Sequence, residues 1–317
     1  MQLFDMHCDT LYRAYTEKST LFDDSFHISF NKAGNIHPYI QCLAVWIPDE
    51  YRGEAAWELF CGCVAKLREQ LEGTDIRWCR SAEDIKEVAR KKEHGIILTV
   101  ESGAVLGGRI GRIQEIYDIG VRMMTLTWNG ENELGDGIMV KENRGLTDFG
   151  RAAVREMERV GMIVDVSHAG EKLFSDVAEI AEKPFAASHS DMRAVTDHPR
   201  NLTDGQFRKL MSDGSLTGLN FCADFLRTKN SETDFPCVLQ ESGMYDIIRH
   251  TGYMLSLGGQ KNIAMGADFD GADLPQDITG LEAMEKLYEL FCKEFGKEIT
   301  DDIFFGNAYR FFTENLS

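Results

Sequence analysis

The sequence is short of positive charge. Its 317 residues include 34 lysines and arginines against 52 aspartates and glutamates, which gives a net charge of −18. A protein that binds nucleic acid or an anionic membrane surface needs a surplus of basic residues at the contact, because the phosphate groups that it meets are negative. We therefore expect neither nucleic acid nor a membrane as a partner.

Long apolar segments are also missing. No window approaches the roughly 20 apolar residues that a membrane-spanning helix needs. His7 follows too soon after the start to leave room for a secretion signal. The last residues are too polar for an anchor tail. The sequence therefore predicts a cytoplasmic protein.

Closely spaced cysteine pairs are almost absent. The chain has eight cysteines, none in a CxxC pair, and only Cys61 and Cys63 are close together. A chain of this length does not need disulfides to be stable, and several of the cysteines lie in apolar runs. We expect reduced, mostly buried thiols.

Short apolar runs alternate with helical patterns along the chain. Most runs have the length of a buried strand and precede a segment with apolar residues three or four positions apart. Eight such runs predict an α/β fold, a (β/α)8 TIM barrel of the metal-dependent hydrolase type. It would be a single domain over residues 1–317, because no linker or change in composition divides the chain. The first expected strand ends at His7, and the others lie at 40–47, 95–100, 121–127, 162–166, 184–187, 215–221 and 262–267.

Expected helices fill most of the intervals, and the polar segment 17–37 is expected to be a long loop. Ser81 has the character of a helix N-cap, with Asp84 three residues later. The other expected helices lie near 55–71, 110–119, 150–160, 171–181, 203–212, 239–256, 278–293 and 300–314.

Residues that can bind a metal follow five of the expected strands. In (β/α)8 barrels the carboxyl ends of the strands meet at one mouth, where active sites lie. Imidazole and carboxylate groups suit Zn²⁺ and its neighbours in the periodic table. The residues at these strand ends are His7, Asp9, Glu101, His168, His189 and Asp268.

Six potential ligands indicate two metal ions rather than one. Two cations a few ångströms apart repel each other, so an anion must lie between them. Glu101 can bridge them with its two oxygens, and a hydroxide can bridge on the other side. The hydroxide forms from a water molecule whose pKa the metals lower, so a nucleophile is present at neutral pH.

The segments around these residues resemble the renal (membrane) dipeptidase family of the amidohydrolase superfamily. The similar segments occur in the family's order and reach almost to the last helix. They are Phe4–Asp9, Val100–Gly103, Asp165–His168, Ala187–Ser190, Gly266–Gly271 and Gly306–Arg310.

The resemblance implies a binuclear zinc site. One zinc ion would bind His7, Asp9 and Glu101, and the other would bind Glu101, His168 and His189. The resemblance also implies a possible homodimer.

Two further roles follow from the resemblance. Asp268 would be the carboxylate that handles the proton, and Arg200 would bind the C-terminal carboxylate of the substrate. An arginine suits that role because its planar fork matches a carboxylate.

The chain departs from animal members of the family after the fourth expected strand. Those members have a histidine that is thought to steady the oxyanion, whereas this sequence has Trp128 and Asn129. Trp128 can donate one N–H group but carries no charge. We take both residues as candidate substrate-binding residues.

The function expected from these features is that of a zinc-dependent dipeptidase. A metal-bridging hydroxide would attack the peptide carbonyl of L,L- and plausibly L,D-dipeptides. Two alternatives stay open. One is another amidohydrolase reaction, such as hydrolysis of N-acyl-D-amino acids or lactams. The other is a metal-bound barrel that binds peptides without turnover.

Overall fold

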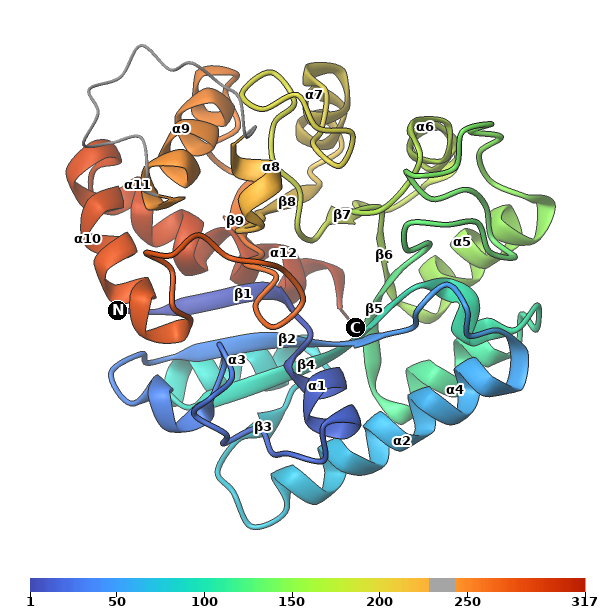
Figure 1. The fold of residues 1–317 in the computed structure, drawn as a ribbon, viewed down its shortest axis with the longest axis horizontal. Helices are drawn as coiled ribbons and strands as arrows, with labels where there is room; N and C mark the ends of the chain where they lie inside the picture. Colours follow the sequence, from blue (N-terminus) through green and yellow to red (C-terminus); the bar gives the residue numbers. More distant parts are fainter. Residues whose placement is uncertain (228–242, 317) are drawn as a thin grey trace.

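A closed barrel of parallel strands forms the centre of the protein in the computed structural model, which describes residues 1–227 and 243–316. Pairing of β2 with β4 closes the ring (Figure 1). Within the described residues, the eight strands of this ring are β1 (Leu3–Cys8), β2 (Tyr39–Trp46), β4 (His94–Glu101), β5 (Val121–Thr125), β6 (Ile163–Asp165), β7 (Ala186–Ala187), β8 (Leu216–Leu219) and β9 (Ile263–Met265). The predicted (β/α)8 barrel is therefore confirmed.

The sheet has one strand that the sequence analysis did not expect. β3 (Arg77–Trp78) pairs with the start of β4, where Arg77 lies opposite Gly95. β5 pairs with the same edge of β4 only from Leu98 onward. β3 therefore lies beside the ring without being part of it, and two residues are too few to give a recognisable strand pattern.

Helices surround the barrel (Figure 1). Their bounds in the described residues are α1 (Thr10–Thr16), α2 (Gly53–Leu71), α3 (Ala82–Lys91), α4 (Arg112–Ile119), α5 (Asp148–Val160), α6 (Glu171–Ile180), α7 (Asp204–Ser212), α8 (Ala223–Leu226), α9 (Gly243–Ser256), α10 (Met284–Phe295), α11 (Lys297–Asp301) and α12 (Asn307–Asn315).

Most helices agree with the expected positions. Ser81 caps α3 in a capping box with Asp84, as the spacing predicts. The helix expected at 300–314 is in fact α11 and α12 with a π-helical turn between them at Asp302–Gly306. Residues 239–242 of another expected helix lie outside the described residues.

Two short helices, α1 and α8, were missed. The polar segment 17–37 is a loop that contains one 3-10 turn, Phe30–Ala33.

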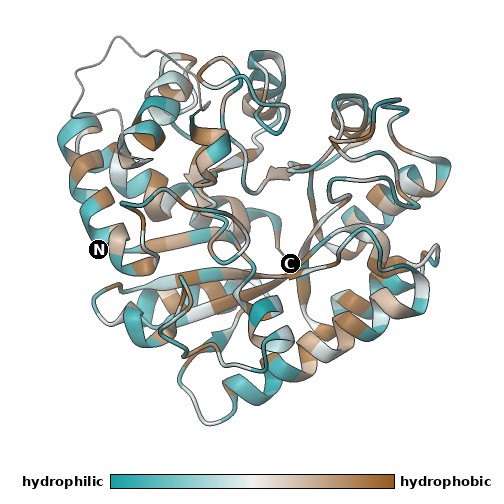
Figure 2. Cartoon of the chain, viewed as in Figure 1, coloured by the Kyte–Doolittle hydropathy of each residue, from teal (hydrophilic) through white to brown (hydrophobic). Residues whose placement is uncertain are grey.

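The helices cover the barrel with their apolar faces. Along α2, hydrophobic and hydrophilic residues alternate in short groups (Figure 2), and the buried ones include Phe60, Val64 and Leu67. These residues are three or four positions apart and so share one face of the helix. Burial of such apolar faces holds the helices against the strands. The packed helices in turn hold the ends of the strands in place.

The cysteines in the described residues are free thiols. Of the seven in the described residues, Cys8, Cys42, Cys63 and Cys79 are buried. Cys237 lies outside the described residues. Within residues 1–227 and 243–316, no helix has both the length and the hydrophobicity to cross a bilayer.

Candidate metal centre

The ends of β1, β4 and β9 bring three carboxylates to one imidazole. His7 Nε2 lies 3.7 Å from Asp9 Oδ2, 3.6 Å from Glu101 Oε2 and 3.7 Å from Asp268 Oδ1. All four side chains are almost fully buried. The ligand atoms of His7, Asp9 and Asp268 lie within 4.8 Å of one another, and so do those of His7, Glu101 and His189, so each set is close enough to bind one cation.

A second group of donor atoms lies on the other side of Glu101. Glu101 Oε1 is 2.8 Å from His168 Nε2 and 3.7 Å from His189 Nε2. The two imidazole Nε2 atoms are 2.9 Å apart. Glu101 therefore faces one group with each of its oxygens, which is the position expected of a bridging ligand. All six residues predicted at the strand ends come together in the structure.

Hydrogen bonds at the far side of each ring define the tautomers of His168 and His189. His168 Nδ1 lies 3.0 Å from Asn129 Oδ1, an acceptor, so this nitrogen carries the hydrogen. His189 Nδ1 lies 2.8 Å from Ser188 Oγ, and that hydroxyl donates to Asp165. Ser188 must therefore accept from His189. Both rings turn a lone pair on Nε2 toward Glu101.

Two polar atoms of the cluster lack a partner. His7 Nε2 and Asp9 Oδ1 are buried and have no hydrogen-bond partner among the described residues. Buried polar atoms without partners are costly. A divalent cation with a preference for nitrogen and oxygen ligands satisfies such a set, so these residues fit the metal that the sequence predicts.

The charges in the cluster also favour a cation. Burial, together with Asp9 and Asp268 nearby, raises the pKa of Glu101 well above its usual value. Burial and then the Arg200 charge hold the pKa of His168 well below its usual value. Burial lowers the pKa of His7, but the carboxylates around it outweigh this effect and raise it to about 10. A bound divalent ion would keep the carboxylates ionised and His168 neutral.

Asp165 supports the two histidine-bearing strand ends. Its Oδ1 accepts from the backbone N–H of Ser167 and of Ser188 at 3.2 and 2.8 Å. Its Oδ2 accepts from the hydroxyls of Thr125 and Ser188 at 2.5 and 2.6 Å. One buried carboxylate therefore ties the ends of β5, β6 and β7 together and orients His189 through Ser188.

Asp5 ties together the ends of β1 and β9 in the same way. It accepts hydrogen bonds from the backbone N–H of His7 at 3.0 Å and of Ala267 at 3.2 Å. Burial raises the pKa of Asp5 to about 6, although both backbone donors favour the charged form. Asp5 thus fixes His7 relative to Asp268, the residue after Ala267.

The turn after β9 presses against the cluster. Gly271 lies so close to it that a Cβ atom there would be 2.0 Å from Asp9 Oδ2 and 2.5 Å from Asp268 Oδ1. Asp268 itself has a left-handed backbone, with φ of 60°. Asn220 Nδ2 donates to Asp268 Oδ2 at 3.1 Å and so fixes the orientation of the carboxylate.

Asp270 anchors this turn to α1. Its buried carboxylate accepts from Thr10 Oγ1 at 2.5 Å, Arg13 Nη1 at 2.9 Å and the backbone N–H of His27 at 2.8 Å. Thr10 directly follows Asp9. Asp270 therefore keeps the turn of Asp268 and Gly271 in a fixed place beside Asp9.

A pocket of about 470 Å³ opens above the cluster. Asp9, Glu101, His168 and Asp268 lie in its wall. Trp128 and Asn129, the predicted substrate-binding residues, both line it as well. Asn129 also holds His168 through the bond described above, so it has a structural contact in addition to its exposure to the pocket.

Arg200 lies against the histidine side of the cluster and is buried. Its Nη1 donates to the carbonyl oxygen of Ser167, and its Nη2 lies 3.1 Å from His168 Nε2 and 3.3 Å from the carbonyl oxygen of His189. The guanidinium carbon is 5.3 Å from the centre of the Phe225 ring, which lines the pocket. Arg200 is thus adjacent to the cluster, at the side of β6 and β7.

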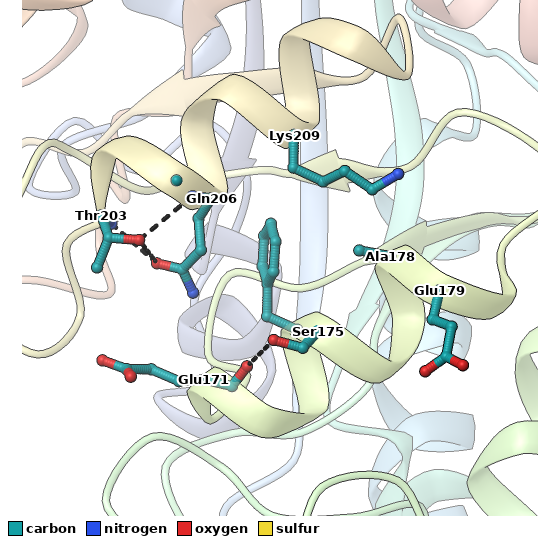
Figure 3. A pocket seen from close by; sticks show the side chains of 9 residues that line it. Glu171, Ser175, Ala178, Glu179, Thr203, Gln206 and Lys209 are labelled. Atoms are coloured by element: carbon teal, nitrogen blue, oxygen red, sulfur yellow. Dashed lines mark hydrogen bonds between the residues drawn. The ribbon is translucent and has the colours of Figure 1, made fainter.

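A second hollow, of about 480 Å³, lies between α6 and α7 on the outside of the barrel (Figure 3). Some of its polar groups are bonded to one another. Thr203 and Gln206 form a capping box, and Ser175 donates to the carbonyl oxygen of Glu171 (Figure 3). The hollow contains none of the residues predicted for the site, so the chemistry is assigned to the barrel mouth.

Several residues of the site were not found from the sequence. Asp5 lies two residues before His7 and Asp165 three residues before His168, which is a weak signal that could have marked them. Asn220 and Asp270 had no such signal. Trp46, which lines the pocket at the end of β2, had been read only as an apolar strand residue.

Known proteins provide an independent comparison. The sequence profile of the membrane dipeptidase family, peptidase family M19, matches residues 1–315. A Klebsiella pneumoniae protein described as an uncharacterized protein in the pqqA 5′ region is 30% identical over 243 residues, which cover 74% of this chain and 87% of that protein. The uncharacterized dipeptidase C965.12 of Schizosaccharomyces pombe is 29% identical over 244 residues, 73% of this chain and 56% of that protein.

Solved structures agree on the fold. A metallo peptidase from Rhodobacter sphaeroides, crystallised with a phosphinate mimic of the dipeptide L-Ala-D-Ala, superposes with a TM-score of 0.89 at 23% identity. The dipeptidase AC superposes with a TM-score of 0.90 at 24% identity. Each comparison covers 100% of this chain and 99% of the other. With the profile match, which confirms the resemblance seen in the sequence motifs, these findings show that the chain belongs to the membrane dipeptidase family, peptidase family M19, a family of metallo-dipeptidases.

Proposed function

We propose that this protein is a zinc-dependent dipeptidase that uses two metal ions. The observation that carries the proposal is the buried cluster of metal-binding side chains around Glu101, whose Oε2 faces His7 and whose Oε1 faces His168. His7 and Asp9 would hold one ion with Glu101. His168 and His189 would hold the other with Glu101. The nitrogen and oxygen donor set supports zinc.

The metal ions, when bound, would supply a bridging hydroxide as the nucleophile and a positive charge for the carbonyl oxygen. The protein residues would do the remaining work. Asp268 would accept a proton during the attack and deliver it to the leaving amine. The bond from Asn220 supports this role, because it orients one carboxylate oxygen and leaves Oδ1 facing the cluster.

Arg200 would bind the C-terminal carboxylate of the dipeptide. Its position beside His168 supports this role, because a carboxylate bound there lies next to a peptide carbonyl at the metal site. Arg200 must then exchange at least one of its present bonds for a bond to the substrate. A carboxylate bound by Arg200 limits the leaving side of the substrate to one residue, and the small pocket limits the length of the other side.

The volume of the pocket and the ligand of a related crystal structure both support a small substrate. The space of about 470 Å³ is of the size of a small-molecule site. The Rhodobacter sphaeroides protein was crystallised with a mimic of L-Ala-D-Ala. We therefore include L,D-dipeptides among the substrates. Trp128 would contribute a neutral contact where animal members have a histidine.

A panel of dipeptides tests the proposal. The panel pairs each L,L-dipeptide with its L,D-counterpart and adds N-acetyl-D-amino acids and lactams, all with added Zn²⁺. Hydrolysis of free dipeptides, with little activity on the other compounds, supports the dipeptidase. Preferred hydrolysis of the N-acetyl compounds or lactams would show a different amidohydrolase reaction. Binding of dipeptides without turnover by zinc-loaded protein would exclude catalysis on this substrate class.

A further inference from the structure

We propose that Tyr12, Trp46 and Trp128 form an aromatic wall that binds the side chain of the first residue of the dipeptide, and that the enzyme therefore prefers an apolar first residue. The inference rests on the proposed function, since it takes the substrate carboxylate to be at Arg200. It adds a substrate class to that function.

The three rings make one continuous surface. The ring centres of Tyr12 and Trp46 are 4.9 Å apart at an interplanar angle of 70°, and those of Trp46 and Trp128 are 4.9 Å apart at 63°. Trp128 continues the surface to His168, whose ring centre is 6.3 Å away. All three aromatic residues are half-buried and line the pocket. Edge-to-face contacts of this kind keep the rings in place, so the wall exists before a substrate binds.

The Trp46 side of the wall stands across the barrel from Arg200, and Trp128, which follows β5, extends the wall toward His168. Trp46 ends β2, and Arg200 follows β7. In the closed ring these two strands are separated by four steps in either direction, through β1, β9 and β8 or through β4, β5 and β6. They are therefore diametrically opposite. The metal-binding cluster lies between the two sides, and Trp46 pairs in register with Glu101 at its centre.

This arrangement orients the substrate. A dipeptide with its carboxylate at Arg200 and its peptide carbonyl at the cluster extends its second residue toward β7. Its first residue must then lie on the other side of the cluster, toward β2. There the side chain meets the aromatic wall.

The chemistry of the wall selects apolar side chains. Each CH₂ group that leaves water for this surface improves binding roughly fourfold. An acidic side chain would gain less, because Asp9, Asp268 and Asp270 also line the pocket. Leucine or phenylalanine as first residue should therefore be favoured over glycine by 10- to 100-fold in kcat/KM, with glutamate below alanine.

Two substrate series test this. In the first, the second residue is D-alanine and the first is glycine, alanine, leucine, phenylalanine or glutamate. In the second, the first residue is alanine and the second is varied in the same way. We expect a steep dependence in the first series and a shallow one in the second. Equal slopes, or a steeper slope in the second series, would overturn the inference.

Variants locate the effect. Trp128→Ala should reduce the leucine-to-glycine ratio at least fivefold. Trp57→Ala removes an aromatic ring from α2, which is outside the pocket lining, and should leave the ratio unchanged. An unchanged ratio in Trp128→Ala and in a second variant, Trp46→Leu, would exclude the wall. If no dipeptide is hydrolysed at all, the proposed function fails instead, so the two failures are distinguishable.

Discussion

His168 and His189 face each other with Nε2 atoms 2.9 Å apart, and both atoms present a lone pair. Two acceptors at this distance repel each other, and the Glu101 carboxylate at 2.8 Å adds negative charge. The bonds to Asn129 and Ser188 prevent either ring from turning its N–H inward. Arg200 Nη2, 3.1 Å from His168 Nε2, offsets part of this repulsion, and a cation bound among these atoms would relieve the rest.

Metal content is the first consequence. We expect purified protein to carry close to two divalent ions per chain, and Glu101→Ala to lose most of both, because Glu101 faces both groups of donors. Elemental analysis measures this directly. Glu115→Ala, on the exposed side of α4, is the matched control. Retention of both ions by Glu101→Ala would exclude the bridging position.

The tautomer of His189 can be tested through Ser188. Ser188→Ala removes the hydroxyl between His189 Nδ1 and Asp165. Loss of such an orienting partner typically weakens metal binding about 10- to 100-fold. Competition with a chelator measures the affinity. Ser175→Ala removes a hydroxyl that only donates to a carbonyl in α6 and should have no effect. Equal metal affinities in the two variants would show that Ser188 does not orient His189.

Asp268→Asn tests the transfer of the proton. The amide keeps the shape of the side chain but cannot accept the proton, and loss of a positioned acid–base group costs about 10²- to 10⁴-fold in rate. We expect kcat to fall by this amount while the metal content and the affinity for a phosphinate inhibitor are kept. Normal turnover would remove Asp268 from the proton pathway. Loss of one ion would instead identify it as a ligand.

Arg200→Ala tests recognition of the substrate carboxylate. A buried charge-assisted contact of this kind is worth about 2–5 kcal/mol when one partner is removed. We expect a large decrease in kcat/KM for dipeptides and a much smaller one for dipeptide amides, which lack the carboxylate. Because Arg200 also contacts His168, metal content must be measured on the same samples. Equal losses on acids and amides at full metal content would show that Arg200 does not read the carboxylate.

His250 lies outside the candidate metal centre and should make the stability of the fold depend on pH. Its Nδ1 accepts from the backbone N–H of Met192, and its Nε2 donates to the carbonyl oxygen of Leu226. Burial, with a smaller contribution from the charge of Arg249, lowers its pKa from 6.5 to about 4. Below pH 6.5 His250 is protonated in the unfolded chain but stays neutral in the folded protein. Stability is therefore complete above pH 6.5 and is lost as the pH falls toward 4, by about 3 kcal/mol at most.

Chemical denaturation of the wild type and His250→Gln between pH 7 and 4 measures this effect. The difference between the two curves removes the pH dependence that they share, including that of metal binding. We expect the variant to have the shallower slope below pH 6.5. His37→Gln, at an exposed histidine, should follow the wild type. Parallel curves for His250→Gln would contradict the prediction.

The sequence predicted which side chains gather at the barrel mouth better than it predicted the residues that support them. His7, Glu101 and His168 were found because each follows an apolar run, and a barrel brings all strand ends to one mouth. Asp5 and Asp165 act by accepting backbone N–H groups from neighbouring strands. Which N–H groups they meet depends on the register between strands, and a single sequence does not contain that information.

The elements that were missed are the short ones. α8 has four residues and β3 has two, so neither is long enough to show a period. α1 begins directly after Asp9, within a segment whose polar residues had been noticed for their chemistry. Trp46 was correctly placed at a strand end, but its exposure to the pocket depends on Tyr12 and Trp128 from other parts of the chain.

Pairing of β1 with β9, the first and the last strand of the barrel, has a consequence for the timing of biosynthesis. Thr10, beside the first two ligands, bonds to Asp270, which is 260 residues later in the chain. At about 5–20 residues per second, a ribosome needs on the order of 10–50 s to make that interval. Throughout this time His7 and Asp9 have left the ribosome without the turn that holds them. The complete site can therefore form only after Asp270 has been made, so the side chains of His7 and Asp9 wait for most of the barrel before they reach their final arrangement.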